Sequence, residues 1–305
     1  MWARRRFVWL VIAATLFMSG YSVAEPLSVR FAVNDQQLNY VSIDKNSPYT
    51  FNSESKKTVV MATLDWPPYI SDFQCNKGWV FQLGVALMLS KGYSVTVHFL
   101  PWARAVKEVE SGNMDILFPE YYIEPEAPSD VYKNKKRLDS LSLSRAFPGG
   151  EIAFMKRPES KVLYDGDLKT LVGESIGVVR GYQNTPEFDR MMDAGQFTIM
   201  HAVNDLQLAK LLYAKRVNLI LADPTVLYYT VKHSNEPDIK VKNIIDNMVP
   251  LQPTLDYKYL YFAISKRKKN WQRMLYDIND ALVNFDHSGQ LNSIIHSESN
   301  QCEPH

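Results

Sequence analysis

Sequence patterns typical of catalysis or cofactor binding are missing or misplaced in this chain. Residues 173–177 read GESIG and match the nucleophile elbow, which places its serine at a sharp turn from a strand into a helix. Ser175 instead comes just before an apolar run, 176–179, that predicts a strand, so the context is reversed. The histidines show no H-E-x-x-H spacing, and the chain has no C-x-x-C, Walker loop or G-x-G-x-x-G. The sequence therefore indicates neither a serine hydrolase, nor a metal site, nor a cofactor.

Polar and aromatic residues recur where predicted strands end or the following helices begin. Each residue alone is equally well explained as a surface aromatic, a helix cap or a turn former. Ligands of open α/β sheets, however, bind outside the carboxyl ends of the strands. The recurrence therefore favours a binding cleft built from these residues: Trp66, Tyr69, Trp102, Arg104, Glu120, Tyr121, Gly181, Tyr182 and Asp223.

The elements that would position these residues alternate between strand and helix. Residues 58–64 predict a strand, 80–91 carry apolar residues at helical spacing, and 94–100 alternate as a strand. Pro101 opens a further helix at the position where proline is best tolerated, and 114–118 form a short apolar strand. This order predicts a doubly wound α/β unit with a parallel sheet.

A second unit of the same kind begins after Gly149 and Gly150. Its predicted strands are 151–155, 175–179, 197–200 and 217–222, and its predicted helices are 186–194, 205–215 and 224–233. The chain then returns through a strand at 258–265 and ends in helices at 271–285 and 290–296. We expect an α/β fold of two hinged lobes, with 58–148 plus 256–298 as lobe 1, 149–255 as lobe 2, and 25–57 as an N-terminal extension containing a hairpin.

The first residues predict export. Arg4, Arg5 and Arg6 precede an apolar run, and small residues at 22–24 suit a signal peptidase, so we expect a signal peptide at 1–24 and a periplasmic protein. A retained N-terminal anchor is the alternative. The net charge is +1, which argues against nucleic acid. In an oxidising compartment Cys75 and Cys302 can form a disulfide, although two free cysteines are also compatible with the sequence.

Several motifs, in order, resemble a known family. They are DWPPY at 65–69, GNMDIL at 112–117, KR at 136–137 followed by LSLS at 141–144, IGVVRG at 176–181 and RVNLILAD at 216–223. The chain from about 59 to 296 is similar to the family 3 extracellular solute-binding proteins, the polar amino-acid receptors of ABC importers. PWARA at 101–105 recurs in a subgroup of such proteins. The resemblance implies the hinged two-lobed periplasmic-binding-protein fold (type II).

The resemblance also implies roles for single residues. Arg137 matches the arginine that holds the ligand carboxylate, and a planar guanidinium pairs bidentately with that group. Asp223 matches the acid that holds the ligand's amino group, and Tyr69 would cover the ligand from lobe 1. The backbone amides around Gly181 and Tyr182 would help to bind the carboxylate. An exposed basic residue is the alternative interpretation of Arg137.

Two departures from the family pattern leave the ligand open. Residues 119–122 read PEYY where a small hydroxyl-rich segment is usual, and Tyr182 stands where a small residue is common. A basic amino acid or a polyamine-like solute is therefore an alternative ligand, with Glu120 as its partner.

We expect the protein to bind an amino acid or a related small solute, without a cofactor and as a monomer. Ligand contacts with both lobes would favour closure about hinge segments at 144–150 and 250–257, and an ABC permease would recognise the closed form. Two alternatives stay open. One is a dehydratase-like enzyme in which Glu120 acts as the general acid; the other is a component that delivers ligand to a sensor kinase.

Overall fold

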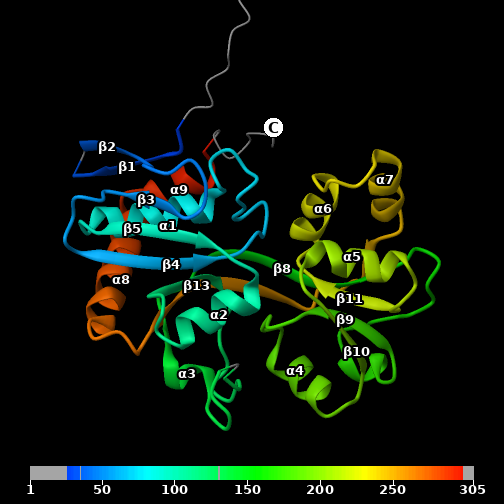
Figure 1. Cartoon of the computed structure of the whole chain (residues 1–305). Helices are drawn as coiled ribbons and strands as arrows, with labels where there is room; N and C mark the ends of the chain where they lie inside the picture. Colours follow the sequence, from blue (N-terminus) through cyan, green and yellow to red (C-terminus); the bar gives the residue numbers. More distant parts are fainter. Residues whose placement is uncertain (1–25, 35, 130, 298–305) are drawn as a thin grey trace, which may run out of the picture.

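The computed structural model describes residues 26–34, 36–129 and 131–297. Two α/β lobes lie side by side, and two long strands run between them (Figure 1). These strands make the sheet continuous across both lobes, in the order β10-β9-β11-β8-β13-β6-β4-β5-β3. The predicted α/β class and two-lobed architecture are confirmed.

Lobe 1 is built around three parallel strands whose middle member is β4. The chain winds to one side through α1 and β5 and then to the other side through α2 and β6. Because the winding reverses at β4, a topological switch point lies at the carboxyl ends of β4 and β6, where ligands of such sheets bind. The elements are β4 (Thr58–Thr63), α1 (Trp79–Ser90), β5 (Ser94–Phe99), α2 (Trp102–Glu110), β6 (Ile116–Glu120), α3 (Arg137–Ser140) and β7 (Leu141–Leu143).

Lobe 2 repeats this winding around β9, with β10 on one side and β11 on the other, all parallel. Two of its helices begin at residues whose side chains cap them: Thr185 accepts from the Phe188 N–H, and Asn204 accepts from the Gln207 N–H. The elements are η1 (Leu168–Leu171), β9 (Ser175–Val179), α4 (Pro186–Asp193), β10 (Thr198–Ala202), α5 (Asp205–Tyr213), β11 (Leu219–Ala222), α6 (Pro224–Lys232), α7 (Asp238–Asp246) and β12 (Val249–Pro250).

The two connecting strands are β8 (Phe147–Lys156) and β13 (Asp256–Ser265), paired antiparallel. One end of β8 pairs with β11 in lobe 2, while one end of β13 pairs with β6 in lobe 1. Between these ends the two strands pair with each other, and Gly150 lies opposite Lys258. A Cβ at Gly149 would lie 2.0 Å from the Lys258 carbonyl oxygen, so the close approach of the two strands requires glycine there. The predicted lobe boundaries at 148/149 and 255/256 fall at the start of these strands.

The N-terminal extension packs on lobe 1. β1 (Ser28–Val33) and β2 (Gln36–Val41) form the predicted hairpin, which lies against α1, and β3 (Tyr49–Phe51) adds to the sheet edge beside β5. Helix α1 is buried almost all round because the hairpin and the C-terminal helices cover it on the side away from the sheet. These last helices are α8 (Trp271–His287) and α9 (Gln290–Ile295).

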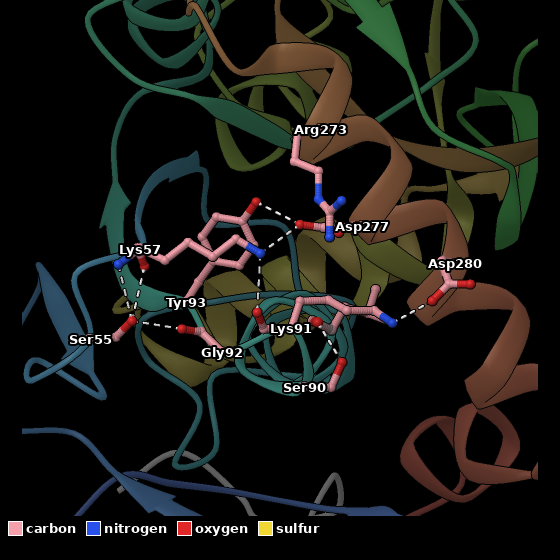
Figure 2. Close-up of polar contacts among 10 residues, drawn as sticks. Ser55, Lys57, Ser90, Lys91, Gly92, Tyr93, Arg273, Asp277 and Asp280 are labelled. Atoms are coloured by element: carbon pink, nitrogen blue, oxygen red, sulfur yellow. Dashed lines mark hydrogen bonds and ion pairs between the residues drawn. The ribbon is translucent and has the colours of Figure 1, made fainter.

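A cluster of ion pairs fixes α8 to the start of the lobe 1 sheet (Figure 2). The buried Asp277 carboxylate accepts from Lys57 Nζ at 2.7 Å and from the Tyr93 hydroxyl at 2.9 Å, and Arg273 Nε lies 3.0 Å away. Burial raises the pKa of Asp277, but the hydrogen bonds from Lys57 and Tyr93 outweigh it and hold the pKa below its ordinary value. Lys91 adds an ion pair to Asp280 one turn further along the helix. The crossing strand β13 and the helix that follows it are thereby tied to lobe 1.

Most predicted elements are found within two or three residues of their expected ends. Helix α7 was not predicted, because only Ile244 of its residues is buried and the apolar pattern is weak. The predicted signal peptide at 1–24 lies outside the described residues, as does Cys302, so the Cys75–Cys302 disulfide stays a prediction. No helix in the described part of the chain is both long and apolar enough to span a bilayer.

Candidate functional site

A small cavity lies between the lobes, at the carboxyl ends of strands from both. Its volume is about 20 Å³, which is room for about one water molecule. The lining is largely aromatic and apolar and includes one carboxyl group: Leu64, Trp66, Trp102, Pro119, Glu120, Tyr121, Tyr182 and Leu260. The lobes are therefore packed against one another in this structure, and a metabolite between them requires that they separate.

Aromatic rings make up most of the wall on the lobe 1 side. The turn after β4 closes through backbone hydrogen bonds between Trp66 and Ile70, and it places the Trp66 ring on the Tyr69 ring with centroids 4.6 Å apart. The edge of Tyr121, from the end of β6, meets the Trp66 ring at 5.6 Å. Across the cleft, Tyr182 meets the ring of Trp102 edge to face at 6.3 Å. Rings from both lobes thus converge on one space.

Several hydrogen bonds link lobe 1 or its crossing strand to lobe 2, and three of them involve residues next to this space. The Tyr69 hydroxyl donates to Asp223 Oδ2 at 2.9 Å. Trp102 Nε1 donates to the Gly181 carbonyl oxygen at 3.2 Å, in a turn where Gly181 has a φ of +85°. The buried Lys258 of β13 donates to the Asn184 carbonyl oxygen. We expect the first two to break when the lobes separate, because their donors and acceptors lie in different lobes.

Asp223 caps a helix and also faces the cleft. It follows β11 and caps α6, because Oδ1 accepts from the N–H groups of Thr225 at 2.8 Å and Val226 at 3.2 Å. Burial raises the pKa of Asp223, and the hydrogen bond from Tyr69 opposes the rise. Only Oδ2 faces lobe 1, so this oxygen is the one available to a ligand.

A second acid of lobe 2, Asp205, was not predicted as a site residue. It is the first residue of α5 and was interpreted only as the start of a helix. The residue is 97% buried; Oδ2 accepts from the Tyr182 hydroxyl at 3.0 Å, and Oδ1 has no hydrogen-bond partner among the described residues. Burial, with a contribution from the neighbouring Asp223, raises the pKa of Asp205 to about 7.

The raised pKa of Asp205 predicts a stability effect. The unfolded pKa is near 3.8 and the folded value is about 7, so between them the native state holds more protons and its stability falls as pH rises. Asp205→Asn keeps an acceptor for Tyr182 and removes the charge. We expect the variant to gain stability over the wild type by about 2–3 kcal/mol more at pH 8 than at pH 5. Urea unfolding of both proteins at the two pH values measures this difference, and an equal gain at both would contradict it.

Arg137, which the sequence predicts as a ligand contact, is buried next to two glutamates. It is 1% exposed and does not line the cavity; its Nη1 lies 3.7 Å from Glu120 Oε2, and its Nε lies 3.7 Å from Glu110 Oε1. Glu110 ends α2 and also accepts from the Ser129 hydroxyl at 2.9 Å. Glu120 Oε1 accepts from the N–H of Tyr121 at 2.9 Å. In this arrangement Arg137 holds Glu120 in place behind the cavity wall.

Solved structures resemble this architecture, whereas no protein-family model and no curated protein matches the chain. A histidine kinase sensor domain with similarity to periplasmic binding proteins superposes with a TM-score of 0.62, at 16% identity over 79% of this chain and 95% of its own. An ancestral arginine-binding protein bound to arginine superposes with a TM-score of 0.61, at 17% identity over 79% of this chain and 97% of its own. An arginine transport system periplasmic binding protein from Legionella pneumophila superposes with a TM-score of 0.59, at 13% identity over 78% of this chain and 98% of its own. The chain has the periplasmic-binding-protein fold.

Within the periplasmic-binding-protein fold, most of the predicted site residues meet at the cleft. Eight of them line the cavity or bridge the lobes around it: Trp66, Tyr69, Trp102, Glu120, Tyr121, Gly181, Tyr182 and Asp223. Arg104 does not: its side chain is 66% exposed and lies 3.8 Å from Glu108 on the same helix. The described residues bring no three His, Cys, Asp or Glu side chains together as a metal site would need.

Proposed function

We propose that this protein is an exported binding protein that closes its two lobes around a small polar solute and presents the closed form to the permease of an ABC importer. The observation that carries the proposal is the cavity at the carboxyl ends of β4, β6 and β9, lined from both lobes and bridged by Tyr69 and Asp223. The two crossing strands supply the hinge. A solute that contacts both walls favours closure, because its contacts are complete only when the lobes meet.

The solute would contact Trp66, Tyr69 and Glu120 from lobe 1 and Tyr182 and Asp223 from lobe 2. The cavity of about 20 Å³ is smaller than any amino acid, so the bound lobes would stand slightly wider apart than in this structure. The sequence of residues 1–24 supports export to the periplasm, and a solute-binding role there needs no cofactor.

Delivery to a sensor kinase is the second candidate function. It is favoured by one observation, the similarity to the sensor domain of a histidine kinase at a TM-score of 0.62. An enzymatic role fits the geometry less well. Both Glu120 oxygens face protein donors, the Tyr121 N–H and the Arg137 guanidinium, which suits a fixed acceptor better than a proton donor.

A thermal-shift screen tests the binding function. The probes are the twenty common amino acids, polyamines and small organic acids, each at about 1 mM. A solute present at about 100 times its Kd stabilises the protein by about 2.7 kcal/mol, so we expect the Tm to rise by about 5–8 °C. The same rise is expected in Asp246→Asn, a change on the exposed face of α7 far from the cleft. If no solute raises the Tm, the proposed function is wrong.

A further inference from the structure

We propose that the solute of this cleft is an organic amine, a cation that is recognised through carboxylates and aromatic faces and needs no carboxylate of its own. The inference rests on the binding function proposed above and names the chemical class of the solute.

Acidic side chains from both lobes converge on the cleft through its tyrosines. Asp223 accepts from the Tyr69 hydroxyl, Asp205 accepts from the Tyr182 hydroxyl, and Glu120 accepts from the backbone N–H next to it. Burial is the main cause of the raised pKa of the Tyr121 hydroxyl, and Asp223, Asp205 and Glu120 add to it, so these acids contribute a negative field at Tyr121. A cation is the ligand that such a field favours.

Asp205 points most directly to an N–H donor. The residue is 97% buried, and its Oδ1 has no hydrogen-bond partner among the described residues. A buried acceptor without a partner is costly, and an ammonium group would satisfy it with a charge-assisted hydrogen bond. Because Oδ2 of the same group is held by Tyr182, which lines the cavity, the acid is fixed on the cleft side of lobe 2.

The aromatic lining suits the same chemistry. Ring faces attract cations, and Trp is the strongest partner. Trp66, Trp102, Tyr121 and Tyr182 all line the cavity. One ammonium group already lies there: Lys258 Nζ stands 5.5 Å from the centroid of the Tyr121 ring.

Three basic side chains near the cleft contact other parts of the protein. Arg137 is buried between Glu110 and Glu120. Lys258 donates to the Asn184 carbonyl oxygen, and burial lowers its pKa. Arg104 is exposed beside Glu108. Among the described residues, the lining of the cavity includes a carboxyl group and aromatic rings but no Lys or Arg.

Amines and their parent amino acids form matched pairs that test this class. Isothermal titration of the full mature protein compares agmatine with arginine and cadaverine with lysine, and includes neutral and acidic amino acids. We expect at least one amine to bind roughly tenfold or more tightly than its parent amino acid. Equal or tighter binding of the amino acid, or binding of neutral or acidic amino acids alone, overturns the amine class and leaves the binding function standing. If none of these solutes nor any other in the screen binds, the binding function itself fails.

Two variants test whether Asp205 and Trp102 contact the amine. Asp205→Asn keeps the shape and removes the charge, and it should weaken amine binding roughly tenfold or more. Trp102→Leu removes a ring face and should weaken it roughly fivefold. Asp246→Asn, which removes an exposed acid outside the cleft, is the matched control and should bind like the wild type. An amine affinity that is unchanged in both cleft variants, with folding verified by circular dichroism, overturns the proposal.

Discussion

Gly150→Ala is expected to weaken ligand binding about 10- to 100-fold while leaving each lobe folded. Gly150 lies in the crossing strand β8, directly under the contact between Tyr69 and Asp223. A Cβ there would lie 2.1 Å from the Tyr69 hydroxyl oxygen and 2.5 Å from Asp223 Oδ2. Overpacking of this kind costs about 1–3 kcal/mol. When the lobes separate, Tyr69 moves away with lobe 1, so we expect the cost to fall mainly on the closed form.

The neighbouring position supplies the control for Gly150→Ala. Glu151 is exposed and, because side chains alternate along a strand, points to the other face of β8. Glu151→Ala should therefore leave the affinity within about twofold. The Kd from titration and the radius of gyration with and without ligand measure affinity and closure separately. Wild-type closure in Gly150→Ala would show that Tyr69 and Asp223 do not meet over this strand.

The sequence predicted the elements of the fold because its apolar periodicity is clear and its turns are well marked. The strand at Ser175–Val179 was predicted to the residue, since it lies between Gly173 and Gly181 and all but its first residue are buried. Asp223 was predicted because it directly follows an apolar strand and precedes a proline that opens a helix. Positions of this kind, at the carboxyl end of a strand, are visible in the chain itself.

Other features of the site depend on partners that are distant in sequence. Asp205 shows the pattern of an ordinary helix start, and only the packing of Tyr182 against it shows that it faces the cleft. Arg137 could not be distinguished from an exposed arginine, because its burial depends on Glu110 at the end of a helix 27 residues earlier. Periodicity shows which face of a helix is apolar, but it does not show which buried acid meets which buried base.

The buried acids give lobe closure a physical cost that the ligand can offset. Burial raises the pKa of both Asp205 and Asp223 in this structure, and we expect part of this burial to arise when the lobes approach one another. A proton or an ammonium group can compensate this cost, and the ammonium group also gains the ring faces. Solute binding and closure are therefore coupled through the same carboxylates. Arg137 and Glu120 both belong to lobe 1, so we expect their contact to persist when the lobes separate.

Arg137→Ala is expected to destabilise the protein by about 3–5 kcal/mol, because it leaves Glu110 and Glu120 buried without their guanidinium partner. Urea unfolding followed by circular dichroism measures the loss. The triple variant Arg137→Ala with Glu110→Gln and Glu120→Gln should recover part of it, since the uncompensated charges are removed with the cation. A loss under about 1 kcal/mol would show that the buried ion pairs contribute little.

The same variant separates two roles for Arg137. If the guanidinium held a ligand carboxylate directly, Arg137→Ala would weaken the binding of arginine and lysine but not of their decarboxylated amines. If it only positions Glu120, the affinities of both members of each pair fall together, because the acid they share is displaced. Arg137→Lys adds a second comparison. A lysine keeps the positive charge next to Glu120 but cannot pair with both glutamates through a planar fork. A positioning role therefore predicts that Arg137→Lys binds amines better than Arg137→Ala but less tightly than the wild type. The proposed class of solute requires the second pattern.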